Sequence, residues 1–112
     1  MGANKVTIEK GSKIVTLINV FTVDPQNIQK LINLFEQGTT DLFSKQPGFI
    51  ALSIHKGFDG KQVVLYGQWR SKQDIDNFRT VPEIQAYFKK VKELSVFESI
   101  VCDEITNIHT SL

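Results

Sequence analysis

Three side chains that could take part in binding or catalysis occur within otherwise apolar segments of this sequence: Asn19, His55 and Trp69. Asn19 shares one side of its segment with apolar neighbours, so its amide is predicted to be buried, and an unpaired buried amide costs about 1–3 kcal/mol. The imidazole of His55 could accept a proton from a substrate, although a lone histidine at a strand end is more often structural. No metal site is expected, because His55 and His109 are far apart and Cys102 is the only cysteine.

Two glycines occupy positions at which a larger residue would be favoured. Gly67 lies in the middle of a predicted strand, on the same side as Leu65 and Trp69, and Gly38 lies on the apolar stripe of a predicted helix. Either the indole of Trp69 fills the space and Asn19 bonds to the backbone, or the space is an apolar pocket with Asn19 as its polar group. The second interpretation gives the pocket a ring of five apolar side chains: Phe21, Leu65, Trp69, Phe78 and Phe88.

The composition indicates one folded domain. The chain has 112 residues, of which 41% are hydrophobic and 22% are charged. A formal net charge of +1 gives no electrostatic reason to expect nucleic acid or an anionic membrane as a partner. Eight Phe, two Tyr and one Trp are a heavy aromatic load for so small a core. These rings either fill the core or line a pocket.

The N-terminal segment differs from the rest of the chain. Residues 1–12 are polar and contain no apolar run long enough for a signal peptide or a membrane helix. We therefore expect a flexible arm at residues 1–12, an ordered domain at residues 13–109, no membrane contact and a cytoplasmic location. The single cysteine fits a reducing compartment of this kind.

The hydrophobic pattern changes period along the chain, and these changes predict the elements. Pro25 is typical of a first helical residue, Pro47-Gly48 ends that helix, and Asp59-Gly60 is typical of a hairpin turn. Ser71 with Asp74 resembles a capping box. The predicted elements are a strand at 13–23, a helix from 25 that includes Leu42 and Phe43, strands at 49–56 and 62–70, helices from 71 and 82, and a strand at 97–108. This β-α-β-β-α-β order predicts a ferredoxin-like α+β fold, with a four-stranded antiparallel sheet and the helices on one face.

The first predicted strand is apolar on both sides. Leu17 and Phe21 point one way, while Ile18 and Val20 point the other. The second strand adds three apolar residues on one side: Ile50, Leu52 and Ile54. Helices cover only one face of such a sheet, and each apolar side chain left in water forfeits about 1.5–3 kcal/mol relative to burial. We expect a homodimer in which two sheets pack face to face.

Several motifs together resemble the antibiotic biosynthesis monooxygenase family. They are Pro47-Gly48-Phe49-Ile50, His55 followed by Asp59-Gly60, the run from Val63 to Ser71 (VVLYGQWRS), the run from Asn19 to Pro25 (NVFTVDP), and Pro82 at a helix start. The resemblance spans nearly the whole ordered region. It implies a dimeric α+β barrel of two ferredoxin-like domains, in agreement with the assembly expected from the apolar strand faces.

The resemblance also implies a reaction. Polyketide-tailoring members of the family oxidise anthrone or quinol substrates with O₂ and without metal or flavin, because the substrate loses a proton and its anion reacts with oxygen. Carried over to this chain, Asn19 would hold a substrate oxygen, Trp69 would stack on the substrate, and His55 or Tyr66 would accept a proton. The implied partners are a small aromatic molecule and O₂, with no cofactor. The expected substrate-binding residues are Phe21, Phe35, Leu65, Gly67, Ile75, Phe78 and Phe88.

The sequence departs from the family pattern at three polar positions. An Asn, a Tyr and an Arg of the polyketide-tailoring members are replaced here by Leu65, Ile75 and Phe88. One alternative is therefore a dimer that binds a small hydrophobic metabolite without turnover, and another is a purely structural dimer. Haem-degrading relatives also share the fold, and Asn19 matches their strand Asn. Phe88 stands where their axial His would be, so haem degradation is not expected.

Overall fold

Strands and helices follow one another in the predicted order in the computed structural model, which describes residues 4–111. The strands are β1 (Val15–Val23), β2 (Phe49–Lys56), β3 (Gln62–Trp69) and β4 (Ser95–Cys102). The α-helices are α1 (Ile28–Asp41), α2 (Lys72–Phe78) and α3 (Pro82–Leu94). Two short 3-10 helices, η1 (Pro25–Asn27) and η2 (Phe43–Lys45), flank α1.

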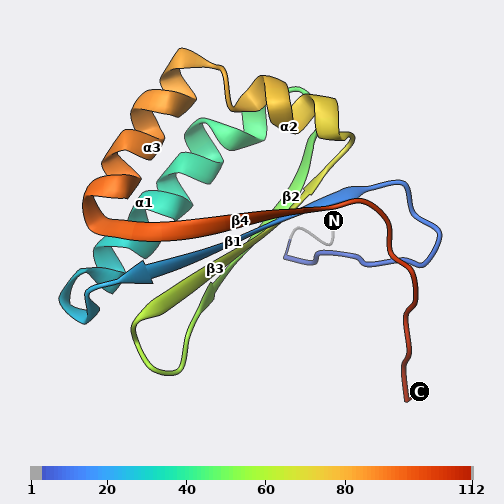
Figure 1. The fold of residues 1–112 in the computed structure, drawn as a ribbon, viewed down its shortest axis with the longest axis horizontal. Coiled ribbons are helices and arrows are strands. Elements are labelled where there is room, and N and C mark those ends of the chain that lie inside the picture. Colours follow the sequence, from blue (N-terminus) through green and yellow to red (C-terminus); the bar gives the residue numbers. More distant parts are fainter. Residues whose placement is uncertain (1–3, 112) are drawn as a thin grey trace.

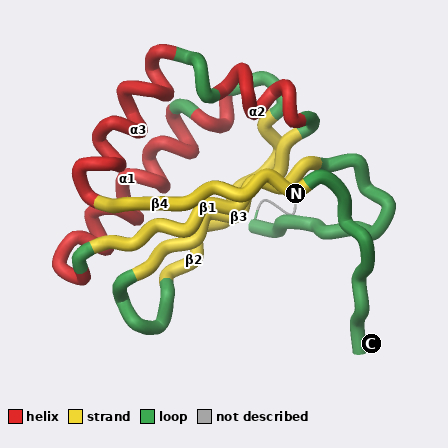
Figure 2. Tube along the Cα trace, in the orientation of Figure 1, coloured by secondary structure: helices red, strands yellow, loops and turns green. Residues whose placement is uncertain are grey.

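The four strands form one antiparallel sheet in the order β2-β3-β1-β4. The three α-helices all lie on the same face of this sheet (Figure 1). Figure 2 shows α1 and α3 side by side over the strands, with α2 at the end where β2 and β3 curve toward it. The predicted ferredoxin-like α+β fold, with its helices on one face, is confirmed.

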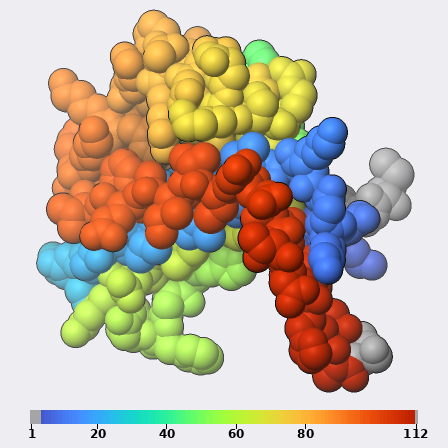
Figure 3. Space-filling model, turned by 45° about the vertical axis from the view of Figure 1, so that its right-hand side comes forward, coloured from blue at the N-terminus to red at the C-terminus, as the bar shows by residue number. Residues whose placement is uncertain are grey.

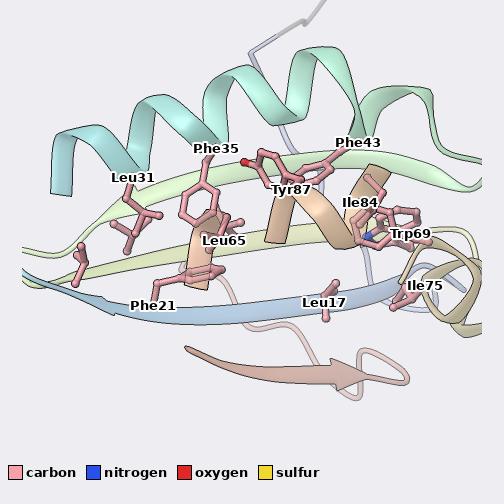
Figure 4. Close-up of a cluster of buried hydrophobic side chains, with 14 of the residues drawn as sticks. Leu17, Phe21, Leu31, Phe35, Phe43, Leu65, Trp69, Ile75, Ile84 and Tyr87 are labelled. Carbon is pink, nitrogen blue, oxygen red and sulfur yellow. The ribbon is translucent and has the colours of Figure 1, made fainter. Parts of the chain in front are cut away.

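The hydrophobic core lies between the sheet and the helices. Alternate residues of β1 and β3 point toward the helices, and Phe21 of β1 contacts Phe35 of α1 with ring centroids 4.6 Å apart. Figure 4 shows these side chains meeting between α1 and the strands. Buried aromatic residues come from six elements: Phe21, Phe35, Phe43, Trp69, Phe78 and Tyr87. Much of the aromatic load of the sequence therefore fills the core.

Two predicted boundaries were wrong by more than two residues. The first helix ends at Asp41, because the backbone of Leu42 leaves the helical region at φ −121° and ψ −59°, and Phe43 begins η2. The last strand ends at Cys102 instead of residue 108, since its ladder with β1 ends at the pair Thr16 and Cys102. Beyond that pair, only Val15 remains in β1.

The face assigned to one apolar residue also differs from the prediction. Ile50, Leu52 and Ile54 were expected on one side of β2, but a register shift between Phe49 and Ala51 interrupts the alternation. Leu52 and Ile54 pack against the core, whereas Ile50 is exposed. The bulge accounts for the difference, because an extra residue reverses the side on which later residues point.

The start of α2 is fixed by the carboxylate of Asp74. This carboxylate accepts hydrogen bonds from Arg70 Nε at 2.8 Å, Arg70 Nη2 at 2.7 Å and Ser71 Oγ at 2.7 Å. Ser71 Oγ in turn accepts from the backbone N–H of Asp74, which confirms the predicted cap. The carbonyl of Gly48 accepts from the backbone N–H of Arg70 at 2.8 Å. The Pro47-Gly48 motif and the end of β3 therefore position α2 together.

This network predicts an acid-sensitive contribution to stability. Hydrogen bonds from Arg70 and then Ser71 lower the pKa of Asp74 below the 3.8 of an ordinary aspartate. A carboxyl group with a lower pKa in the folded state stabilises the fold at neutral pH, and this contribution is lost as pH falls through the folded-state pKa. Urea unfolding should therefore show Asp74→Asn less stable than the wild type at pH 7, with the difference shrinking below about pH 4. A difference that does not depend on pH would contradict this role.

Part of the predicted N-terminal arm contacts the sheet face opposite to the helices. Gln68 Nε2 donates to the carbonyl of Thr7 at 2.8 Å, and Gln68 is buried. Residues 1–3 of the predicted arm lie outside the described residues. Among residues 4–111, no helix combines the length and the apolar character needed to cross a membrane.

Candidate active site

A cavity of about 460 Å³ lies between the sheet and the helices α2 and α3. On the face shown in Figure 3, β4 (orange to red) lies directly below α2 and α3 (yellow to orange), which are the elements that border the cavity. The residues that line it are Leu17, Asn19, Phe78, Arg79, Ile84, Gln85, Phe88, Lys92, Phe97 and Ser99. Its volume lies within the range of small-molecule sites.

Three phenyl rings form the aromatic part of the cavity wall. The ring of Phe88 lies 6.0 Å from that of Phe97 and 6.3 Å from that of Phe78, measured between centroids. Phe78 and Phe88 meet edge to face, at an interplanar angle of 89°. Rings at these different angles offer both face and edge contacts to a flat aromatic ligand.

Asn19 provides the buried polar group of the cavity. Its side chain is 7% exposed, and its Oδ1 accepts a hydrogen bond from Ser99 Oγ on the neighbouring strand β4. One of the two interpretations of the sequence gave Asn19 a backbone partner, but the register places Ser99 directly opposite Asn19. Within the described residues, the Asn19 Nδ2 donates no hydrogen bond. Since every fully buried polar side-chain atom there has a partner, this nitrogen is not fully buried. This nitrogen can therefore donate to a molecule in the cavity.

The remaining polar lining residues carry positive charge or none. Arg79 follows α2, Lys92 lies on α3, and Gln85 Nε2 donates to the carbonyl of Arg79 at 3.3 Å. None of the ten lining residues is Asp, Glu, His, Cys or Tyr. The lining can therefore bind and stabilise an anion, but it offers no carboxylate or imidazole as a proton acceptor.

Trp69 lies behind this cavity and not in its wall. Its indole is 2% exposed and contacts Phe78, with ring centroids 4.8 Å apart. A Cβ added to Gly67 would lie 3.6 Å from Trp69 Nε1, and only about 20 Å³ remains open beside these residues. The indole therefore fills most of the space that Gly67 leaves.

The second glycine is also matched by an aromatic side chain. A Cβ at Gly38 would lie 2.4 Å from the ring of Tyr87, whose hydroxyl donates to the carbonyl of Leu34 at 2.6 Å. Burial raises the pKa of Tyr87 well above its ordinary value, so this hydroxyl stays protonated. Gly38 therefore serves helix packing, and the expected gap between the two glycines is occupied by Trp69 and Tyr87.

The predicted substrate-binding residues divide into three groups. Phe78 and Phe88 line the 460 Å³ cavity together with Asn19. Leu65 and Gly67 line only the 20 Å³ space beside Trp69. The other three are buried in the core and line neither space: Phe21, Phe35 and Ile75.

His55 and Tyr66 lie on the sheet face opposite to the cavity. In the strand register, His55 pairs with Val64 and Tyr66 pairs with Ile18, so both alternate with the residues that face the helices. His55 Nε2 is 2.8 Å from Ser53 Oγ. Neither predicted proton acceptor reaches the cavity of its own chain.

Seven lining residues were absent from the sequence prediction: Leu17, Arg79, Ile84, Gln85, Lys92, Phe97 and Ser99. One signal in the sequence could have found some of them. Ile84, Phe88 and Lys92 are spaced four apart on the last helix, so they share one face. To predict Phe97 and Ser99 as lining residues, one would need to know that the first and last strands pair, which a single sequence does not show.

Comparison with known proteins places these features in a family. The antibiotic biosynthesis monooxygenase family matches residues 14–90 of the chain. Tetracenomycin-F1 monooxygenase of Streptomyces glaucescens is 36% identical over 97 residues, which cover 87% of each protein.

Solved structures agree in fold. A monooxygenase from the gene ActVA-Orf6 of Streptomyces coelicolor, in complex with nanaomycin D, is 26% identical with a TM-score of 0.76, over 87% of this chain and 92% of that one. The cofactor-independent oxygenase SnoaB of Streptomyces nogalater is 22% identical with a TM-score of 0.70, over 89% of this chain and 98% of that one. The match at the level of both sequence and fold shows that the chain belongs to the antibiotic biosynthesis monooxygenase family.

Proposed function

We propose that this protein is a cofactor-independent monooxygenase that uses O₂ to oxidise a small aromatic or quinol-like substrate in the 460 Å³ cavity. The observation that supports this most strongly is the lining, in which three phenyl rings share one cavity with the amide of Asn19. Its relative of 36% identity is a tetracenomycin-F1 monooxygenase, and the ActVA-Orf6 monooxygenase was solved with nanaomycin D bound.

In the proposed reaction, the substrate lies against Phe88, and an oxygen atom attached to the substrate's ring accepts a hydrogen bond from Asn19 Nδ2. That bond, together with the positive charge of Arg79 and Lys92, stabilises the anion left when the substrate loses a proton. The proton passes to water at the cavity mouth, because no lining residue is a suitable acceptor. The anion transfers electrons to O₂, so that a ring CH₂ and O₂ give a carbonyl and water. No step is assigned to His55 or Tyr66.

Asn19→Leu tests this proposal, because leucine keeps the branching of the side chain at Cγ and removes the donor. We expect oxygen uptake with anthrone as substrate to fall about a hundredfold, the usual loss for one oxyanion donor. Ser99→Ala is the matched control, since it removes the hydrogen bond to Asn19 but keeps the amide, and it should lose less activity. Wild-type protein that consumes no oxygen with anthrone or with small quinols would contradict the proposal.

A second candidate function is binding of a hydrophobic metabolite without turnover. The absence of a carboxylate, imidazole, thiol or phenol among the ten lining residues favours it. Trp69 contacts Phe78 of the cavity wall, so its fluorescence should respond to a bound aromatic ligand. Saturable quenching of Trp69 by anthrone, without product or oxygen uptake, would support binding over catalysis.

We also propose that the protein is a homodimer joined through the sheet face opposite to the helices. That face carries exposed apolar side chains, among them Val96 at 72% and Ile100 at 55% exposure. Sedimentation velocity at micromolar concentration should give twice the mass of one chain, and Ile100→Lys should shift it to monomer. Ile108→Lys, outside the sheet, is the matched control and should stay dimeric. A wild-type monomer would contradict the assembly.

A further inference from the structure

The charges along the cavity are segregated. Arg79 and Lys92 line it, and neither forms an ion pair with an acidic residue in the described part of the chain. Neither Glu93 of α3 nor Glu98 of β4 lines the cavity. Glu98 of β4 alternates with the lining residues and borders a hollow on the opposite sheet face, and Glu93 of α3 borders a groove toward α1. The cavity therefore carries two positive charges with no neighbouring carboxylate in its lining.

The two cations stand at different ends of the cavity. Ile84, Phe88 and Lys92 follow one face of α3, and eight residues of helix span about 12 Å. Arg79 lies at the Ile84 end, because the side chain of Gln85 bonds to its backbone carbonyl. An aromatic body between the phenyl rings would thus have a cation beyond each end.

We propose that the cavity selects aromatic substrates that carry an ionised carboxyl group, with Arg79 and Lys92 as its specificity-determining residues. This proposal rests on the proposed function and narrows its substrate class. Arg79 binds the carboxylate, because a planar guanidinium can donate two parallel hydrogen bonds to it. Lys92 acts as a point charge at the other end and contributes less.

Binding of two non-oxidisable probes tests the proposal: an anthracene carboxylate and the carboxamide of the same ring. They share shape and differ in charge, so their ratio of affinities reports charge selection alone. We expect the wild type to bind the carboxylate about tenfold more tightly, as one charge-assisted bidentate contact at a solvated site allows. The preference should fall as salt is raised, because the site is open to solvent.

Single substitutions show which residue produces the preference for the carboxylate probe. Arg79→Gln should remove most of it and Lys92→Gln a smaller part, because each variant should weaken binding of the carboxylate more than binding of the carboxamide. Lys89→Gln is the matched control, since Lys89 is exposed on the same helix and does not line the cavity. Equal affinity of the wild type for the two probes, or binding of neither, would overturn the proposal.

Failure of this inference can be told apart from failure of the proposed function. Charge selection with no oxygen uptake from anthrone would leave the specificity in place and contradict catalysis. Oxygen uptake with no charge selection would leave catalysis in place and contradict the role of Arg79.

Discussion

Trp69→Ala is expected to lower the free energy of unfolding by about 3–5 kcal/mol, as large aromatic-to-alanine changes in a core do. The indole is 2% exposed and contacts Phe49 and Phe78, with ring centroids at 5.5 and 4.8 Å. Removing it joins its volume to the small space beside Gly67 and leaves Phe78 without support. In a chain of this size, the melting temperature should fall by about 10 °C or more.

Chemical unfolding followed by circular dichroism measures this loss, and Trp69→Phe is the control that keeps an aromatic ring at the site. The phenylalanine variant should lose clearly less stability than the alanine variant. The alternative role, a wall that stacks on the substrate, predicts a different pattern. A stability loss below about 1 kcal/mol, together with lost binding of aromatic ligands, would contradict the core role.

Gly48→Ala is expected to destabilise the protein by about 3 kcal/mol, from two sources that add. Gly48 has φ +84°, a left-handed conformation that costs a residue with a Cβ about 1–2 kcal/mol. The added Cβ would lie 2.4 Å from the carboxyl carbon of Asp74, so it must displace the group that Arg70 and Ser71 hold. Because α2 begins at this network, Phe78 and Arg79 of the cavity should shift as well.

Gly60→Ala separates these two sources. Gly60 has φ +70°, but an added Cβ would meet nothing within 4 Å, so only the backbone cost of about 1–2 kcal/mol applies. Urea unfolding of the two variants should therefore differ by about 1–2 kcal/mol, the cost of overpacking. Equal losses would mean that the Cβ at Gly48 finds space without moving Asp74.

Local signals in the sequence were sufficient for the fold. The hairpin glycine Gly60, the cap at Ser71 and Pro82 at a helix start each specify a boundary through nearby residues, and all three act as predicted. The end of β4 at Cys102 depends on where β1 stops, which is a property of two distant strands. The bulge at Ile50 likewise arises between strands.

The site was predicted less completely than the fold, for the same reason. The burial of Asn19 followed from alternation within one strand, but its partner Ser99 is 80 residues away along the chain. The sequence left open whether the space at Gly38 is filled, and a ring from another helix, Tyr87, occupies it. Spacing within one element shows which face a residue shares, but it does not show which distant side chain fills the space opposite.

The most direct test of the central claim is a crystal structure of the protein with bound anthraquinone, the oxidation product of anthrone. We expect the ring system to lie among Phe78, Phe88 and Phe97, with one quinone oxygen within hydrogen-bond distance of Asn19 Nδ2. Anthraquinone bound instead on the opposite sheet face beside His55 and Tyr66, with the cavity empty, would contradict it.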